Sequence, residues 1–244
     1  MAMFDRDLDN GTVHIHYEES GSGFPVLLIA PGGLRSAITA WRNAPWNPID
    51  QLAPHYRAIA MDQRNAGSST GPITAADGWH TYTADQLALL DHLGVDRFHV
   101  LGMCIGGAYL LSLLRTAPER VVSAVFLQPI GLEGNRDTFR DLFGGWATEI
   151  RDTHPEAVDA DLAGLCEHLY GGDDVLFSAS TAQVATMTNP MLVLMGDDLY
   201  HPQVASRTLA ATAPNATLIE RWKDPDSIPV AQKAVDEFLT RHTP

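Results

Sequence analysis

The sequence is poor in cysteine and basic residues, and it has no long apolar run. Its two cysteines, Cys104 and Cys166, are too few for a disulfide framework and lack the spacing of metal ligands. No apolar stretch approaches the roughly 20 residues that span a bilayer. The opening residues, MAMFDRDLDNG, lack the basic segment and apolar segment of a secretory signal. These absences favour a reduced, cytoplasmic protein with no membrane partner.

The shortage of basic residues gives the chain a strong negative charge. Lysine and arginine number 16 against 30 aspartate and glutamate residues, a net charge of −14. A field of that sign repels phosphate, so we expect no nucleic acid as a partner. With 244 residues, of which 45% are hydrophobic, the chain fits one domain with a sizeable core. We expect a small molecule as its partner, and neither a metal nor an organic cofactor.

Short apolar segments alternate with helical ones along the chain. This alternation predicts an α/β fold, with a mostly parallel sheet and helices on both faces. Strands are predicted over 12–17, 25–30, 56–61, 97–101, 121–127, 191–195 and 216–220, and helices over 83–93, 105–116 and 231–239.

One segment, 132–190, breaks the alternation because its pattern is helix and loop. Its apolar stripe consists of Val158, Leu162, Leu165 and Leu169. We expect a single domain over 1–244, with 132–190 inserted as a small helical cap over the strand ends. The alternative is that these helices cover one face of the sheet.

The stretch LGMCIGG, 101–107, has the spacing of a nucleophile turn, with cysteine where serine is usual. Gly102 and Gly106 leave room for a tight strand-to-helix turn, and Gly107 lets the helix approach the sheet. The Cys104 thiol would then lie at a helix N-terminus, which lowers a thiol pKa from about 8.5. We predict that Cys104 is a nucleophile, and the alternative is a buried structural cysteine.

A second glycine-rich turn, Pro31-Gly32-Gly33, follows another predicted strand. Ligands bind beyond the carboxyl edge of a parallel sheet, where both turns would meet. We expect the backbone N–H groups of Gly33 and Ile105 to form an oxyanion hole there. The residues expected in the substrate pocket are Met103, His80 and Trp146.

Four motifs make the chain resemble the α/β-hydrolase superfamily along nearly its whole length. PGG stands where members often carry HGG, and DQRNAGSS resembles the loop D-x-R-G-x-G-x-S. GMCIGG matches the nucleophile elbow, and NPMLVLMGDDLYHP resembles the strand and loop that deliver the triad acid. The resemblance implies the α/β-hydrolase fold and the chain order nucleophile, acid, histidine. It implies an acid at Asp197 or Asp198, of which Asp198 is favoured.

The loop in which the resemblance implies a histidine contains none. This loop, 221–227, reads RWKDPDS, and His242 is expected in the tail beyond the last helix. Two other histidines are candidate bases: His201, three residues after Asp198, and His80, before the helix expected beside the elbow. A third alternative is that no histidine acts as base. A thiol is partly ionised near neutral pH and intrinsically nucleophilic, so it depends on a base less than a serine does.

These residues favour an acyl-group enzyme that uses Cys104 as a covalent nucleophile. The activity would be that of an esterase, thioesterase or acyltransferase. The aromatic residues of the segment 132–190 favour an apolar substrate: Phe139, Phe143, Trp146, Tyr170 and Phe177. The alternatives are cofactor-free lyase or decarboxylase chemistry in the same pocket, and a ligand-binding protein whose elbow has lost catalysis.

Overall fold

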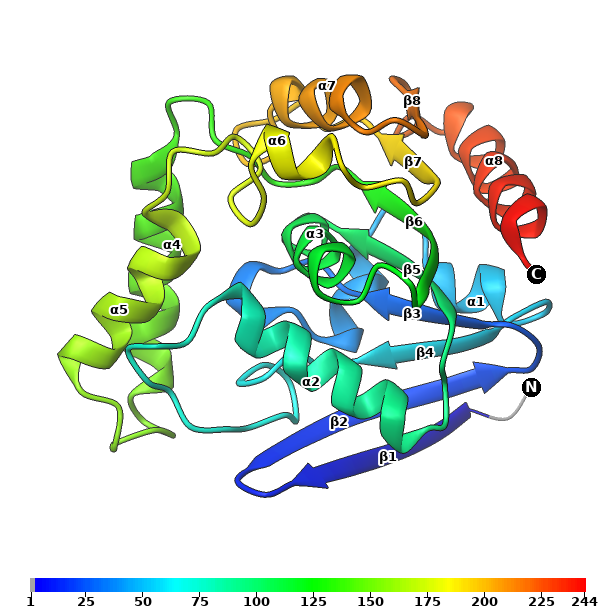
Figure 1. The fold of residues 1–244 in the computed structure, drawn as a ribbon. Coiled ribbons are helices and arrows are strands. Elements are labelled where there is room, and N and C mark those ends of the chain that lie inside the picture. The colour runs from blue at the N-terminus through cyan, green and yellow to red at the C-terminus, as the bar shows by residue number, and fades with distance from the viewer. Residues whose placement is uncertain (1–2) are drawn as a thin grey trace.

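The computed structural model describes residues 3–244, so the first two residues of the predicted domain lie outside the described residues. An eight-stranded sheet runs through the molecule in the order β1-β2-β4-β3-β5-β6-β7-β8 (Figure 1). Strands β3 to β8 are parallel, and β2 is antiparallel to both β1 and β4. The strands are β1 (Met3–Asn10), β2 (Val13–Gly21), β3 (Pro25–Ile29), β4 (Arg57–Met61), β5 (Phe98–Met103), β6 (Val121–Leu127), β7 (Met191–Leu194) and β8 (Ala216–Ile219).

Helices cover both faces of this sheet, as the alternating pattern predicts (Figure 1). Helices α2, α3 and α7 pack on one face, and α1 and α8 pack on the other. The helices are α1 (Pro48–Leu52), α2 (Trp79–His92), α3 (Gly106–Thr116), α4 (Arg136–Ile150), α5 (Asp159–Tyr170), α6 (Thr181–Val184), α7 (Gln203–Thr212) and α8 (Ser227–His242), with 3-10 helices η1 (Gly33–Arg35) and η2 (Ile38–Asn43).

The two cores follow from the period of two along each strand. In β3, Leu27 and Ile29 belong to the core beneath α2 and α3, whereas Val26 and Leu28 belong to the core beneath α1 and α8. Every residue of β5 is buried. A strand between two helical layers has no polar face, which is why the central strands read as continuous apolar runs.

The segment between β6 and β7 carries three helices in two different places. Helices α4 and α5 pack together beyond the carboxyl ends of the parallel strands, at the left of Figure 1. Helix α6 instead packs against α7 on the sheet face. In α5, Leu162, Leu165 and Leu169 are buried as the stripe predicts. Val158 is 57% exposed, because its extended backbone precedes the helix and takes its side chain out of the helical period.

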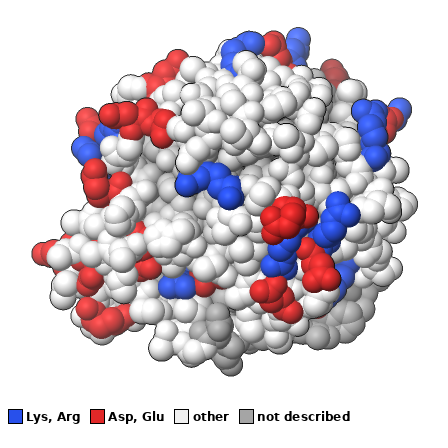
Figure 2. Space-filling view, viewed as in Figure 1, with Lys and Arg blue, Asp and Glu red and all other residues white. Residues whose placement is uncertain are grey.

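Acidic side chains gather along the α4–α5 side of the molecule, at the left of Figure 2. Basic side chains lie near the middle of that face, and a cluster of both signs lies to their right. Across residues 3–244, no helix combines the length and the apolar character needed to cross a membrane.

Candidate active site

Cys104 lies in the turn between β5 and α3 with a left-handed backbone, φ +62°. Such a conformation costs a residue with a side chain roughly 1–2 kcal/mol, so neighbouring structure has to hold it. The Cys104 N–H donates to the Leu127 carbonyl oxygen at 3.0 Å, and the Cys104 carbonyl oxygen accepts from the Ile130 N–H at 3.1 Å. These two bonds fix the turn to the segment that follows β6.

The glycine after this turn allows α3 to approach the sheet. A Cβ atom at Gly106 would lie 2.9 Å from the carbonyl oxygen of Ile29, at the end of β3. Any side chain here would push the helix away from the strand and move Cys104 with it. The expected role of Gly106 in a tight strand-to-helix turn therefore has a direct steric basis.

The loop after β7 doubles back on itself between Gly196 and His201. The Asp198 Oδ1 atom accepts hydrogen bonds from the backbone N–H groups of Tyr200 and His201, both at 3.0 Å. A Cβ atom at Gly196 would overlap the carbonyl oxygen of His201 and lie 2.5 Å from its Cβ. The bonds to Asp198 and the lack of a side chain at Gly196 thus allow the loop to fold back, so that His201 lies against Gly196.

This fold of the loop pairs the His201 ring with the Asp198 carboxylate. Nδ1 of His201 lies 2.7 Å from Oδ1 and 2.9 Å from Oδ2 of Asp198. An ionised carboxylate can only accept, so Nδ1–H donates and Nε2 is left for another partner. Nε2 is buried and has no hydrogen-bond partner among the described residues. Cys104 and His201 nevertheless interact closely enough for each to shift the pKa of the other.

The charges of Cys104 and His201 stabilise each other. Burial would raise the pKa of the Cys104 thiol, but hydrogen bonding to His201 and the charge of His201 outweigh burial and bring that pKa below its ordinary value. Burial would lower the pKa of His201, but Cys104 and Asp198 outweigh it and raise that pKa. These opposite shifts favour a thiolate beside an imidazolium.

The two adjacent aspartates of the loop have separate environments. Asp198 faces His201, and although burial would raise the pKa of its carboxyl, the bonds from His201 hold that pKa below its usual value. Asp197 is 59% exposed at its side chain and pairs with Lys223 Nζ at 2.6 Å. Lys223 Nζ lies farther, 3.7 Å, from Asp198 Oδ2. The structure thus brings Asp198, and not Asp197, to the imidazole.

Two backbone N–H groups point at the sulfur of Cys104, those of Gly32 and Ile105, and both lower the thiol pKa. Ile105 is one of the two donors expected from the sequence. The other expected donor, Gly33, lies one residue further along the loop and lines the cavity beside the sulfur. The backbone of Gly32, with φ +124°, turns the loop at this point.

A cavity of about 250 Å³ opens beside the sulfur, between the sheet edge and α4. Aromatic and aliphatic side chains supply most of its surface, as the sequence leads us to expect for an apolar substrate. The lining residues are Gly32, Gly33, Leu34, Arg35, Cys104, Ile105, Ile130, Phe139, Leu142, Phe143, Tyr170, Tyr200 and His201.

The three residues expected in the pocket are not among those that line this cavity. Met103 is buried in the core beneath α1 and α8, because successive residues of a strand face opposite sides. Trp146 is buried on α4, with its ring 5.5 Å from that of Phe143. His80 is exposed and lines a separate surface groove with His168. Phe143, also on α4, lines the cavity, whereas Trp146 does not.

Arg35 and Tyr200, which were not among the expected pocket residues, line the cavity from η1 and from the loop after β7. Position could have indicated both: Arg35 lies two residues after the turn PGG, and Tyr200 lies within the segment NPMLVLMGDDLYHP. No cluster of three or more histidine, cysteine, aspartate or glutamate side chains in residues 3–244 could hold a metal ion.

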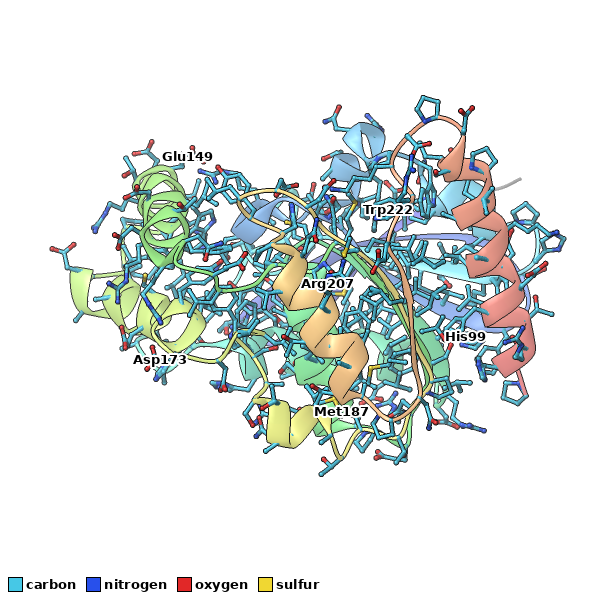
Figure 3. The ribbon with its side chains drawn as sticks, turned by 90° about the horizontal axis from the view of Figure 1, so that it is seen from above. His99, Glu149, Asp173, Met187, Arg207 and Trp222 are labelled. Carbon is cyan, nitrogen blue, oxygen red and sulfur yellow. The ribbon has the colours of Figure 1, made fainter. Side chains whose placement is uncertain are left out.

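A tryptophan occupies the loop between β8 and α8, in which the resemblance implies a histidine. Trp222 is 1% exposed, and its Nε1–H donates to the Met195 carbonyl oxygen at 2.8 Å. Its ring packs edge-on against Trp46, 5.3 Å away. Figure 3 labels Trp222 on this segment. His242 lies in the last turn of α8, and not in a tail beyond it, with its ring 4.8 Å from that of Phe238.

Relatives of known name match this chain over part or all of its length. A putative non-heme bromoperoxidase of Mycobacterium tuberculosis is 32% identical over 58% of the chain, a match that covers 50% of that protein. The chain therefore spans about half the length of this relative. A putative carbamate hydrolase of Serratia proteamaculans is 28% identical over 84% of the chain and 86% of that protein.

The fold recurs in solved structures at low sequence identity. A meta-cleavage product hydrolase of Pseudomonas fluorescens superposes with a TM-score of 0.71 at 19% identity, over 98% of each chain. The family model described as alpha/beta hydrolase fold matches residues 25–174, which include the turn at Gly32, the turn at Cys104 and helices α4 and α5. The chain belongs to the alpha/beta hydrolase fold family.

Proposed function

We propose that this protein is an acyl-group enzyme in which Cys104 is the covalent nucleophile, His201 the acid–base group and Asp198 the residue that orients it. The observation that carries the proposal is the position of His201, whose Nδ1 lies 2.7 Å from Asp198 and whose ring interacts with the Cys104 thiol. A nucleophile, a base and a group that orients the base are the parts that acyl transfer requires.

The first half-reaction would acylate the sulfur. The Cys104 thiolate attacks the carbonyl carbon of an ester or thioester, and the carbonyl electron pair moves onto oxygen. The backbone N–H groups of Gly32 and Ile105, which interact with the sulfur, would donate to that oxygen. When the carbonyl re-forms, the bond to the leaving alcohol or thiol breaks, and the leaving group takes the proton from Nε2 of the His201 imidazolium.

The second half-reaction would release the acyl group. His201 is then neutral, and its Nε2 accepts a proton from a water, alcohol or amine that attacks the thioester carbonyl. Asp198 holds the ring through Nδ1 in both steps, and it stabilises the imidazolium that forms. The Cys104 thiolate leaves, and the pair returns to its starting charge state.

The apolar cavity supports a substrate with a hydrocarbon acyl group. Phe139, Phe143 and Tyr170 form an aromatic wall on its cap side, and Leu34 and Ile130 lie on the sheet side. A cavity of about 250 Å³ suits a small or medium acyl chain and excludes a polymer.

Intact mass spectrometry with 4-nitrophenyl hexanoate tests the proposal. We expect a transient hexanoyl increment that peptide mapping assigns to Cys104, together with steady release of nitrophenol. Cys104→Ala removes both, and Cys166→Ala, a change of the other cysteine, removes neither. Unchanged turnover in Cys104→Ala would contradict covalent catalysis. A stable increment without turnover would leave Cys104 reactive but refute a complete cycle, and no increment in the wild type would favour the lyase or ligand-binding alternatives.

A further inference from the structure

One charged side chain lines the otherwise apolar cavity. Arg35 follows the glycine turn at Gly32 and Gly33, and among the described lining residues it is the one with a permanent charge. Apart from the Cys104–His201 pair, the remaining lining is glycine, aliphatic or aromatic. A guanidinium in this position makes one end of the cavity cationic in a protein whose net charge is −14.

The guanidinium has unused hydrogen-bond donors. Nε of Arg35 donates to Oε2 of Glu149, in the last turn of α4, at 2.7 Å. Neither Nη1 nor Nη2 makes a hydrogen bond to the part of the chain that the structure describes. Arginine presents its donors as a planar fork that matches a carboxylate, so the four N–H groups of Nη1 and Nη2 remain available.

The cap leaves these donors open. A side chain at Gly145, on α4, would have Nη2 of Arg35 as its neighbour at 3.8 Å, and one at Gly144 would meet no atom within 4 Å. Glycine in the interior of a helix weakens it, so two in succession are not explained by helix stability. The lack of a side chain at Gly145 leaves free space between α4 and the guanidinium.

The carboxylate of Glu149, which belongs to the same chain, already accepts a hydrogen bond from Nε of the Arg35 guanidinium. Its side chain is 65% exposed and that of Arg35 is 43% exposed, so the ion pair is a surface pair that contributes little to stability (Figure 3 labels Glu149). The contact with Arg35 holds the pKa of the Glu149 carboxyl below its usual value. A substrate carboxylate could therefore share the guanidinium or displace Glu149 from it at low cost.

We propose that Arg35 is a specificity-determining residue that binds an anionic group, a carboxylate, at the far end of the acyl chain. The preferred substrates are then esters or thioesters of dicarboxylic acids, with an apolar chain between the reacting carbonyl and the carboxylate. This inference rests on the proposed acyl chemistry at Cys104. The inference adds a preference for negatively charged substrates, which the aromatic and aliphatic lining of the cavity alone would disfavour.

Matched esters test this preference. Mono-4-nitrophenyl esters of the dicarboxylic acids from succinate to suberate are compared with the 4-nitrophenyl esters of the monocarboxylic acids of equal length. The quantity measured is the ratio of kcat/KM for the anionic ester to that for the neutral ester. We expect Arg35→Gln to lower this ratio roughly tenfold for the best chain length, the effect of one charge-assisted hydrogen bond.

Two further variants distinguish binding of a substrate carboxylate by Arg35 from a purely structural contact between Arg35 and α4. Arg42→Gln removes the same charge from an exposed position on η2 that does not line the cavity, and the ratio should stay within about twofold. Glu149→Gln removes the competing carboxylate, so the ratio should rise. If Arg35 only braces the cap, Arg35→Gln and Glu149→Gln lower both esters equally, the ratio stays constant, and the inference is wrong.

A binding measurement keeps the inference independent of turnover. Calorimetry compares adipic acid monoamide, which is anionic, with hexanamide, which is neutral. Stronger binding of the anionic compound that is lost in Arg35→Gln supports recognition even if no ester acylates Cys104 and the proposed function fails. Equal binding of the two compounds overturns it even if Cys104 is acylated.

Discussion

Nδ1 of His201 lies 2.7 Å from the carboxylate of Asp198, three residues earlier in the chain, so a candidate base and its orienting acid share one loop. The order nucleophile, acid, histidine that the resemblance implies is therefore kept, with the last two members brought close together in sequence. The position in which the resemblance implies the histidine belongs to Trp222, which is a packing residue.

We expect Asp198→Asn to lower kcat for ester hydrolysis roughly a hundredfold or more, because an amide in place of the carboxylate no longer fixes the His201 tautomer or stabilises its charge. Steady-state kinetics with a neutral nitrophenyl ester measure the effect. The matched control is Asp197→Asn, one residue away, which breaks only the exposed pair with Lys223. Equal losses in the two variants would contradict the assignment of Asp198.

Alkylation by iodoacetamide should report the lowered pKa of the Cys104 thiol. The thiolate is the reactive form, so its alkylation should persist at pH values below the ordinary range of a cysteine and fall as the pH drops through the lowered pKa. His201→Gln removes the main stabilising partner, so the profile should move to higher pH. Cys166 provides an internal control, since burial raises its pKa and it should react slowly at neutral pH. Identical profiles for the two cysteines would refute the thiolate–imidazolium pair.

Trp222→Phe should lower the free energy of unfolding by about 1–3 kcal/mol, because it leaves the buried Met195 carbonyl oxygen without its indole donor. Urea unfolding followed by circular dichroism measures this change. Trp46→Phe is the matched control, since the Nε1 atom of Trp46 is buried without a hydrogen-bond partner among the described residues. A larger loss in the control than in Trp222→Phe would show that the hydrogen bond is unimportant.

His99 should make the stability depend on pH. Its Nδ1 lies 2.8 Å from Ser123 Oγ and its Nε2 lies 3.0 Å from Thr243 Oγ1. Burial, aided by the charge of His242, lowers the pKa of His99 to about 4. The unfolded chain, with a histidine pKa near 6.5, therefore binds more protons between these values.

The stabilising effect of neutral His99 is complete above pH 6.5 and is lost as the pH falls toward 4, by at most about 3 kcal/mol. Urea unfolding at several pH values should show a shallower slope over this window in His99→Gln, whose side chain does not titrate. The same slope in wild type and His99→Gln would exclude His99 as the cause.

Most of the sheet could be predicted from the sequence because its central strands are buried on both faces and read as apolar runs. Strand β1 was missed, since MFDRDLDN at the sheet edge is rich in charged letters and has no apolar period. Helix α7 was missed because its sequence, QVASRTLAAT, is dominated by small and polar residues and buries few side chains. Pattern reading detects an apolar period, and neither sequence has a clear one.

The candidate site was predictable where backbone geometry determines it, and less so where loops do. The glycine spacing around Cys104 indicated the turn that the structure contains. The position of His201 depends on the folding of a short loop, which needs a glycine at 196 and the carboxylate bonds of Asp198. The mistaken pocket residues, Met103 and Trp146, came from closeness in sequence to the site, which does not say which way a side chain faces.

The short separation of Asp198 and His201 in the sequence, three residues, has a consequence for local unfolding. An acid and a base held on separate loops lose their alignment whenever either loop opens, so their geometry depends on two regions staying folded together. Here the pair belongs to one hydrogen-bonded loop between β7 and α7. The N–H of Met195, just before this loop, donates to the Ile219 carbonyl oxygen of β8 at 2.9 Å. The alignment of acid and base thus needs this one loop to stay folded, and the pairing of β7 with β8 supports that loop.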